Sequence, residues 1–578
     1  MSLFGWIQAL VFFSIVFILV KPMGIYMANV YDGKRTFLSA VLSPVEHFVS
    51  RLAGIEHDDE MDWKKYTSAF LILSFLSIVL IYFLQRLQNY LPLNPIGFGA
   101  VPRDLAIHTA VSFVSNTNWQ NYVPEASLSW MVQVFGLTVQ NFISAAAGMA
   151  VLIAFIRGFT RESTKYLGNF WVDLIRGIVH ILLPLSLVLS IFLVSQGVIQ
   201  TFRPGVEIDF LDQADSEFPQ FIPLGPAASQ VAIKMLGTNG GGFFNANAAH
   251  PFENPTPLSN FAQMVSILLI PAGLCYTFGH LIGDKRQGWV IFFVMLFVLA
   301  GFFVITFSSE SVNNPDLGRH ISEIHGLDTS PDGNFEGKET RFGISNSALW
   351  GTLTTAASSG SVNANLNAFS PLGSLNLMML MMVGEVIFGG VGSGLYGMLV
   401  FVIIAVFVAG LMIGRTPEFL GKKIEIFEVK MAALLILLMP LFVLGLTALA
   451  ISVNSGQSAI FNPGPRGFSE VLYAYTSQVN NNGSAFAGLA ANSPFYNLTG
   501  TIAMLIGRYG QAIMILAMAG SLVEKNRVPA GSGTLSTTSV LFITWLVVII
   551  VLVGALNFLP VLVLGPVIEQ ILLFGVAL

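Results

Sequence analysis

Long apolar segments alternate with polar loops along the whole chain. Ten segments are mostly apolar and close to the 20 residues that a helix needs to cross the hydrocarbon core of a membrane. They lie near residues 4–27, 67–90, 130–156, 172–197, 261–283, 289–307, 374–414, 430–453, 500–523 and 538–558. The pattern therefore predicts an all-α polytopic membrane protein with about ten transmembrane helices.

The segment 374–414 is too long for one straight span. Its middle is rich in glycine, at Gly384, Gly389, Gly390, Gly392, Gly394 and Gly397. We predict two half-helices joined by a flexible glycine loop, because glycine is a poor residue for a helix interior. The tail beyond Pro560 is apolar again, and the sequence leaves open whether it re-enters the membrane.

Four short polar turns interrupt the apolar pattern at regular intervals. They read Thr117-Asn118-Trp119, Thr238-Asn239-Gly240, Ser358-Ser359-Gly360 and Asn481-Asn482-Gly483, and their middle residues are 121, 120 and 123 positions apart. A short helix too brief to cross a membrane is predicted before each turn, near 103–115, 227–237, 345–357 and 469–480. This regularity indicates an internal fourfold repeat.

Each repeat thus contains a span, a short helix, a polar turn and a second span. We expect four pseudo-symmetric helix–pore loop–helix repeats with one extra helix at each end. The predicted boundaries are an N-terminal helix and loop at 1–66, repeats at 67–160, 161–285, 286–425 and 426–525, and a C-terminal helix at 526–578. The third repeat carries the broken second helix.

A half-helix that enters the membrane and returns through a polar turn is typical of an ion filter. The C-terminal end of such a helix carries partial negative charge, which favours a cation, and turn carbonyls can replace its water. One such turn would be more simply an ordinary outer loop, but four at the same place in a repeat favour the filter. The expected ligands are oxygens of Asn116, Thr117, Asn118, Thr238, Asn239, Gly240, Ser358, Ser359, Gly360, Asn481, Asn482 and Gly483, supported by Gln120, Gly241 and Gly242.

The distribution of charge sets the expected orientation. Only 10% of residues are charged and 54% are hydrophobic, and the net charge of −5 argues against a nucleic-acid partner. One set of loops holds 18 of the 27 lysines and arginines, so we place those loops in the cytoplasm by the positive-inside rule. Both termini and all four turns then fall on the outer side. The outer loops 203–226 and 308–345 are long and acidic, as a folded cap would be.

Several residues at predicted membrane depth are candidates for a gate or cavity. They are Glu385, Gly390, Gly392, Gly394 and Arg508. For Glu385 an ion-path role and a structural hydrogen-bonding role both remain open, because intramembrane acids are costly and often functional. Arg508 either repels cations below the filter or forms an ion pair with a neighbouring span. The GxGxxG pattern at 392–397 lies inside a span, so we interpret it as a hinge and not as a nucleotide site.

The chain contains no Walker A sequence and no Asp-Lys-Thr-Gly phosphorylation motif. We therefore expect no nucleotide on this chain, and energy must come from a partner or from an ion gradient. The single cysteine, Cys275, lies in an apolar stretch and is expected to be a buried small residue.

Five local strings carry a resemblance to a known family. They are Phe113–Gln120, Gly237–Asn247, His250–Thr256, Thr355–Gly360 and Asn480–Phe486. In these strings and over the whole chain, the protein resembles the KdpA family, the potassium-binding and translocating subunits of Kdp potassium pumps, within the superfamily of potassium-channel-like cation transporters. The resemblance implies K⁺ as the transported ion and a complex in the bacterial cytoplasmic (inner) membrane. It also implies a P-type ATPase subunit that hydrolyses ATP, two small membrane subunits, and sideways passage of K⁺ into the ATPase subunit.

Two other functions remain open from the sequence. The first is a self-sufficient cation transporter or channel of the same superfamily, driven by the membrane gradient. The second is a membrane scaffold that transports nothing, which the four repeated turns make a poor fit. Purification with or without an ATPase partner separates the first from a pump subunit.

Overall fold

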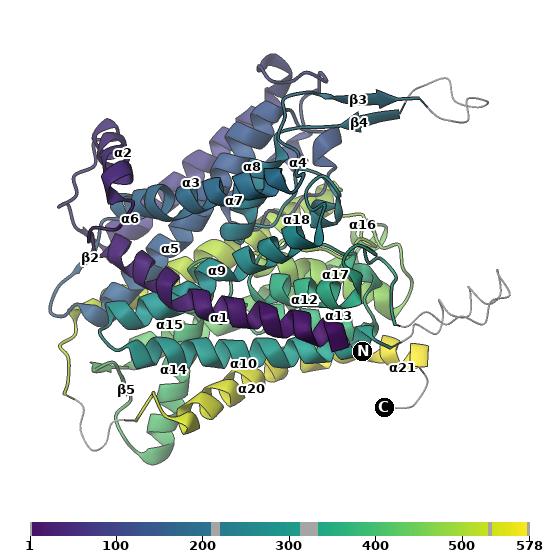
Figure 1. The fold of residues 1–578 in the computed structure, drawn as a ribbon. Coiled ribbons are helices and arrows are strands. Elements are labelled where there is room, and N and C mark those ends of the chain that lie inside the picture. The colour runs from purple at the N-terminus through teal and green to yellow at the C-terminus, as the bar shows by residue number, and fades with distance from the viewer. Residues whose placement is uncertain (1–2, 210–219, 313–332, 530–534, 575–578) are drawn as a thin grey trace.

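A computed structural model describes residues 3–209, 220–312, 333–529 and 535–574. Within these ranges, ten helices or helical rods are long and apolar enough to cross a membrane (Figure 1). They are α1 Leu3–Tyr31; α3 Trp63–Arg86; η3 Met131–Thr138 with α5 Val139–Thr160; α6 Phe170–Arg176 with η4 Gly177–Leu182 and α7 Leu183–Ser195; α9 Pro257–Leu281; α10 Lys285–Glu310; α14 Ser393–Ile413; α15 Ile426–Ser452; α18 Pro494–Leu505 with η7 Ile506–Gly510 and α19 Gln511–Glu524; and α20 Val540–Leu562 with η8 Val563–Val567 and α21 Ile568–Phe574. The predicted all-α membrane fold is confirmed.

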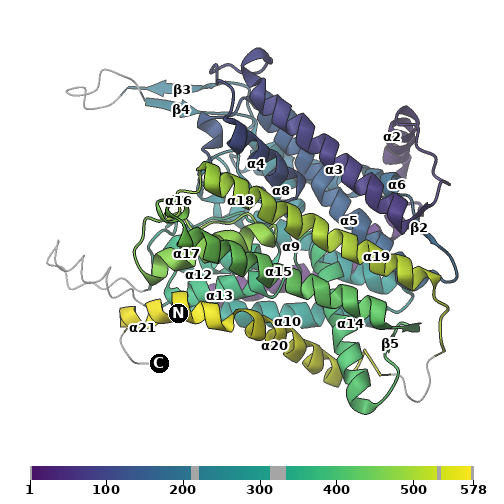
Figure 2. The same cartoon turned by 180° about the vertical axis from the view of Figure 1, so that it is seen from behind.

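Four short helices separate these spans in the order that the repeat predicts. They are α4 Arg103–Val114, α8 Ala227–Leu236, α12 Gly343–Ala356 and α17 Pro465–Val479. Each is followed directly by one of the polar turns and lies between two spans of its own repeat. All four lie toward the end of the molecule that also carries both labelled termini (Figure 1). The rod of α18 and α19 passes beside α4 and α3, so the fourth repeat contacts the first (Figure 2).

The second span of the third repeat is broken, as predicted. Helix α13, Pro371–Met382, ends at the loop 383–392, and α14 begins at Ser393. The loop contains five residues with positive φ, among them Glu385 at 49° and Gly392 at 89°. The loop is closely packed in this conformation, because a Cβ at Gly389 or Gly394 would collide with loop backbone, and its flexibility stays a prediction. We call this loop, residues 383–392, the plug.

Several small elements were not predicted. Helix α2, Ser39–Leu52, and two antiparallel strand pairs, β1 Met61–Asp62 with β2 Tyr166–Gly168 and β5 Glu418–Phe419 with β6 Lys422–Lys423, lie at the end opposite to the termini (Figure 1). The pair β3 Gly205–Ile208 and β4 Gln220–Pro223 projects at the other end, with Val206 opposite Ile222. Single turns complete the chain at η1 Gln88–Tyr90, η2 Pro124–Ala126, η5 Asn247–Ala249, η6 Leu366–Ala368 and α16 Asn454–Gln457.

The described parts of the predicted outer cap form this projecting hairpin and the segment 333–342. Residues 210–219 and 313–332 of the cap lie outside the described residues. The tail that the sequence left open continues α20 as one helical rod through Pro560 to Phe574.

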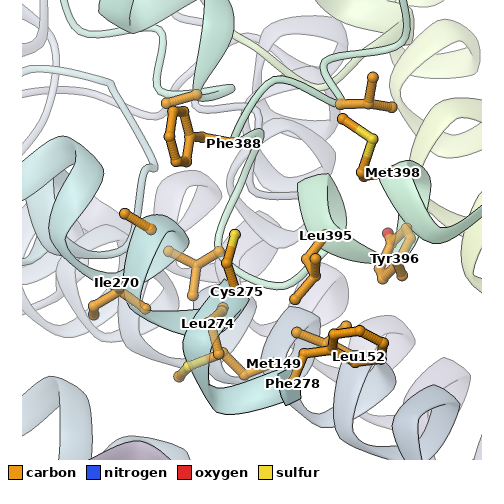
Figure 3. Packing of buried hydrophobic residues seen from close by; sticks show 14 of the residues in the cluster. Met149, Leu152, Ile270, Leu274, Cys275, Phe278, Phe388, Leu395, Tyr396 and Met398 are labelled. Atoms are coloured by element: carbon orange, nitrogen blue, oxygen red, sulfur yellow. The ribbon is translucent and has the colours of Figure 1, made fainter. Parts of the chain in front are cut away.

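The apolar core joins α5, α9 and α14 directly beneath the turns. Met149 and Leu152 of α5 meet Leu274 and Phe278 of α9, and Leu395 and Met398 of α14 close the third side (Figure 3). Cys275 is fully buried in this cluster, as expected. Phe388 carries the glycine loop into the same core, so the plug is anchored by apolar packing.

Candidate ion-binding site

The four polar turns share one unusual backbone pattern. In each turn the first and third residues have positive φ, a region that glycine and asparagine adopt most readily. The pairs are Asn116 (67°) and Asn118 (52°), Thr238 (46°) and Gly240 (70°), Ser358 (50°) and Gly360 (77°), and Asn481 (59°) and Gly483 (99°). The equivalent middle residues are therefore Thr117, Asn239, Ser359 and Asn482, spaced by 122, 120 and 123 positions. The first turn thus begins one residue earlier than its sequence suggests, and Asn118 takes the glycine position.

The middle residues are fully buried and present unused acceptors. The side chains of all four have no exposed surface. Among the described residues, the backbone carbonyls of Thr117, Asn239, Ser359 and Asn482 accept no hydrogen bond. Buried carbonyls are normally paired, so four equivalent unpaired ones indicate a site that a ligand satisfies.

Close backbone contacts join the turns in ring order. A Cβ at Gly240 would collide with the carbonyl oxygen of Ser359, one at Gly360 with that of Asn482, and one at Gly483 with that of Thr117. The glycine of each turn therefore allows the next middle carbonyl to approach. The first turn faces the second through Asn118, whose Cβ lies 3.0 Å from the position that a Cβ on Gly241 would take.

Side chains of the first residues connect adjacent turns. Asn116 Nδ2 donates to the Thr238 carbonyl at 3.1 Å, and Ser358 Oγ donates to the Asn481 carbonyl at 3.1 Å. Asn481 Nδ2 donates to Thr117 Oγ1 at 3.0 Å and closes the ring from the fourth turn to the first. These side chains are structural braces. The middle carbonyls are the oxygens of the ring that stay without a hydrogen-bond donor among the described residues.

The asparagines of the ring also donate outward to the surrounding helices. Asn118 Nδ2 donates to Asn141 Oδ1 at 2.7 Å, and Asn239 Nδ2 donates to Ser144 Oγ at 3.2 Å. The side-chain oxygens of Asn118, Asn239 and Ser359 are buried without a hydrogen-bond partner among the described residues. They are further candidate acceptors beside the carbonyls.

The predicted support residue Gln120 braces two repeats at once. Its Oε1 accepts from the Gly242 amide at 2.8 Å, and its Nε2 donates to the Gly242 carbonyl at 3.2 Å. This two-way bond holds the segment after the first turn against the segment after the second. Gly241, with φ of 61°, brings the backbone round to this contact.

A small polar cavity lies next to the ring, on the side of the glycine loop. Its lining combines residues of three turns with the glycine loop and two spans: Asn116, Ser358, Asn480, Asn481, Gly384, Glu385, Ser393, Tyr396, Arg508 and Gln511. Glu385 is buried, and its Oε1 accepts from Asn482 Nδ2 at 2.7 Å, while its Oε2 has no hydrogen-bond partner among the described residues. Glu385 thus braces the ring through this hydrogen bond and lines the cavity, while its ion-path role stays a prediction.

Arg508 also lines this cavity. It belongs to the π-helical turn η7 and is buried, and its guanidinium donates to the Ser144 carbonyl at 2.8 Å. Among the described residues it has no acidic partner within ion-pair distance, so the ion-pair alternative is wrong for this conformation. A guanidinium therefore borders the cavity, and no described carboxylate lies within ion-pair distance of it.

The three candidate gate glycines hold the plug against the ring. Gly392 packs on the Gly148 backbone too closely for any side chain, and Gly394 packs on the Phe388 carbonyl in the same way. Gly390 lies beside Ser358, and the amide of Val391 donates to Thr238 Oγ1 at 3.0 Å. The loop is thus attached to the second and third turns.

Comparisons with known proteins agree with this architecture. The family described as "Potassium-transporting ATPase A subunit", KdpA, matches residues 10–571. The chain belongs to this family. Proteins named potassium-transporting ATPase potassium-binding subunit from Sorangium cellulosum and Herpetosiphon aurantiacus are 55% and 56% identical to it, over 99% and 98% of this chain and 99% of each relative.

A solved structure shares the fold of this KdpA chain. The potassium transporter TrkH from Vibrio parahaemolyticus aligns with a TM-score of 0.50 over 89% of this chain and 98% of its own, at 12% identity. At that identity the likeness shows a shared fold alone. It agrees with the predicted channel-like arrangement of spans and short helices.

One buried ion pair anchors α8, the short helix before the second turn. Lys234 in α8 pairs with Glu253, and both side chains are fully buried. Its Nζ also donates to Asn247 Oδ1 at 3.0 Å, and the Ser361 hydroxyl donates to the same oxygen at 2.8 Å. A lone lysine in an apolar short helix was the available signal for a brace. Nothing in the sequence identified Glu253, 19 residues downstream, as the partner of this lysine.

Proposed function

We propose that this chain is the potassium-binding and translocating subunit of an ATP-driven K⁺ uptake pump, and that K⁺ is selected in the ring of four turns. The observation that carries the proposal is the set of four equivalent, buried carbonyls without hydrogen-bond donors. Carbonyl oxygens can replace the hydration shell of K⁺, and a braced ring keeps them in place when the ion leaves. The C-terminal ends of four short helices add negative potential at the same point.

The expected filter ligands are the carbonyls of Thr117, Asn239, Ser359 and Asn482, with neighbouring oxygens of the twelve turn residues. Asn116, Thr238 and Ser358 act mainly as braces through their side chains. Glu385 places an oxygen without a hydrogen-bond partner among the described residues just inside the filter, where it can contact a cation that has passed the ring. Arg508 opposes further movement toward the cytoplasm.

A second cavity supports a lateral exit for the ion. It shares Gly384 and Gln511 with the cavity under the ring, and it extends between α14, α15 and α20 past Phe401, Leu435 and Asn557. We propose that K⁺ leaves sideways along this route, with the ATPase subunit bound at this face. The apolar walls would let the ion pass only in company with water or with a partner's polar groups.

The chain then acts as a non-catalytic subunit. Its relatives are named as the potassium-binding subunit of a potassium-transporting ATPase, which supports a P-type ATPase partner that hydrolyses ATP. Two small membrane subunits complete the proposed complex in the bacterial inner membrane. The basic loops lie at the end opposite to the termini, which supports placing both termini on the outer side.

The test is ATP hydrolysis by the complex purified through a tag on this chain. We expect an ATPase subunit to copurify, and K⁺ to stimulate hydrolysis more strongly than Rb⁺ and much more strongly than Na⁺. A preparation that binds no ATPase subunit, yet moves K⁺ down a gradient in vesicles, would favour the gradient-driven transporter instead.

A further inference from the structure

Helix α2 lies at the end of the molecule opposite to the termini and is covered on one side only (Figure 1). It packs against α6 and η4. Its outward face carries Val41, Val45, Phe48 and Leu52, each between 41% and 79% exposed, and Phe37 extends the stripe. The spacing of four, three and four residues places these side chains on one helix face. This amphipathic helix has the form of one that rests in the membrane interface.

A cavity of about 670 Å³ opens beside this helix. It lies between α2, the loop after α1 and the start of the fourth span. Its lining is mostly polar and includes Lys34, Arg35, Thr36, Ser39, Ser43 and Arg176. The apolar stripe and the polar cavity therefore belong to the same short helix and its two neighbours.

The charge of the cavity is positive. Its one acidic lining residue is Glu46, which already accepts from Arg176 Nε at 3.1 Å and pairs with His180 Nε2 at 2.8 Å. These partners outweigh the effect of burial and lower the pKa of Glu46 to about 2, so it stays ionised and occupied. Lys34 is exposed beside Asp32 at 2.8 Å, and Arg35 is exposed with no acidic partner among the described residues.

Two histidines line the same wall. His57 lies 4.0 Å from Glu46, and His47 Nδ1 lies 2.6 Å from the Ser43 carbonyl. The guanidinium of Arg176 reaches to within 3.3 Å of where a Cβ on Gly33 would lie, so it borders the loop that carries Lys34 and Arg35. An anion in the cavity would thus meet basic groups from the loop after α1 and from α6.

We propose that this cavity binds the phosphate headgroup of an anionic phospholipid in the leaflet at the basic end of the molecule. The acyl chains of that lipid would lie along the stripe Val41, Val45, Phe48 and Leu52. The headgroup of a lipid matches the basic cavity, since basic pockets at the cytoplasmic membrane surface attract anionic headgroups. Its acyl chains match the apolar stripe of α2. A soluble phosphate would use the basic groups but would leave the apolar stripe uncovered.

The test is native mass spectrometry of the purified complex with phosphatidylglycerol or phosphatidylcholine of identical acyl chains. We expect preferential retention of phosphatidylglycerol. The variant Lys34→Gln/Arg35→Gln should bind it roughly 30-fold more weakly, since each surface charge contributes about 1 kcal/mol. Both residues are exposed, so the variant should fold. The matched control Lys64→Gln/Lys65→Gln removes two exposed lysines at the start of α3 and should retain the lipid.

Three outcomes would overturn the proposal. They are equal retention of the two lipids, a loss of less than about threefold in the Lys34/Arg35 variant, and displacement of phosphatidylglycerol by millimolar inorganic phosphate. Phe48→Ser separates a lipid from a soluble anion, because only lipid retention should fall. The assay needs no K⁺, so its result is independent of the proposed transport function.

Discussion

The third residue of each turn decides how closely the ring can close. At Gly240 a side chain would meet the Ser359 carbonyl, one of the four proposed ligands. We expect Gly240→Asp to raise the K⁺ concentration for half-maximal ATPase stimulation about tenfold or more, because the strained backbone and the collision each cost a kcal/mol or more. K⁺ titration of ATP hydrolysis in the purified complex measures this shift.

A control for this variant is Gly99→Asp, in the segment between α3 and α4, with open space around the position and an ordinary φ. It should leave the K⁺ dependence unchanged. If Gly240→Asp and Gly99→Asp gave the same titration curve, the second turn would not belong to the filter.

Lys234 shows how a buried charge supports the ring without touching it. We expect Lys234→Met to destabilise the protein by about 3–5 kcal/mol, because Glu253 is left buried and unpaired. The Tm of the purified complex in detergent should fall accordingly. The double variant Lys234→Met/Glu253→Gln should recover part of this loss, while Lys64→Met, which is exposed, should change little. A Tm for Lys234→Met equal to that of Lys64→Met would show that the pair contributes no stability.

The limits of the sequence are clearest at single residues. The four turns were predicted because polar glycine-bearing turns recur at a fixed spacing in apolar surroundings. The register of the first was shifted by one, since Asn118 holds a left-handed conformation that glycine holds elsewhere. Asparagine tolerates the left-handed region through its short polar side chain. An asparagine in a sequence does not, however, predict a positive φ at that position. Which asparagine oxygens brace and which face the ring depends on neighbours from other repeats.

Among the helices, length decided what could be predicted. Spans of about 20 apolar residues and the glycine-broken third repeat were predicted correctly, with ends shifted by a few residues. Helix α2 was missed because its 14 residues alternate apolar and polar faces and contain no long apolar run. The paired strands have two to four residues, too few for a recognisable alternation.

The hairpin β5–β6 is fastened by one buried lysine. Lys422 Nζ donates to the Arg161 carbonyl at 2.7 Å and to the Lys525 carbonyl, so it joins three loops at the basic end. Burial and the neighbouring Arg527 and Lys525 lower the pKa of Lys422 to about 8, although Glu162 acts against them. The fold therefore destabilises the protonated amine.

This shift has a defined pH dependence. Because the folded pKa lies below the unfolded value of about 10.4, the cost of the charge is full below pH 8 and fades as pH rises toward 10. We expect the Tm difference between the native protein and Lys422→Met to shift in favour of the native protein between pH 8 and 10. Lys430→Met, which changes an exposed lysine in the first turns of α15, is the comparison. A pH-independent difference would mean that Lys422 titrates normally.

In the function proposed above, the ring, the cavity and the plug together form the path of the ion. Arg508 is the charge on that path, and we expect Arg508→Ala to let K⁺ leak through the complex without ATP. Flux of K⁺ from vesicles that contain the complex measures this directly. Arg508→Lys keeps the charge and should stay tight. Equal passive flux in the native protein and in Arg508→Ala would show that the plug alone seals the route.

The four turns also come from one polypeptide and differ in sequence. In a filter assembled from four identical subunits, any substitution changes all four quadrants at the same time, so its effect on the filter is large. Here a mutation alters one quadrant and leaves three intact. Natural variation can therefore adjust ion affinity in small, separate increments, and an experimenter can interrogate each quadrant alone.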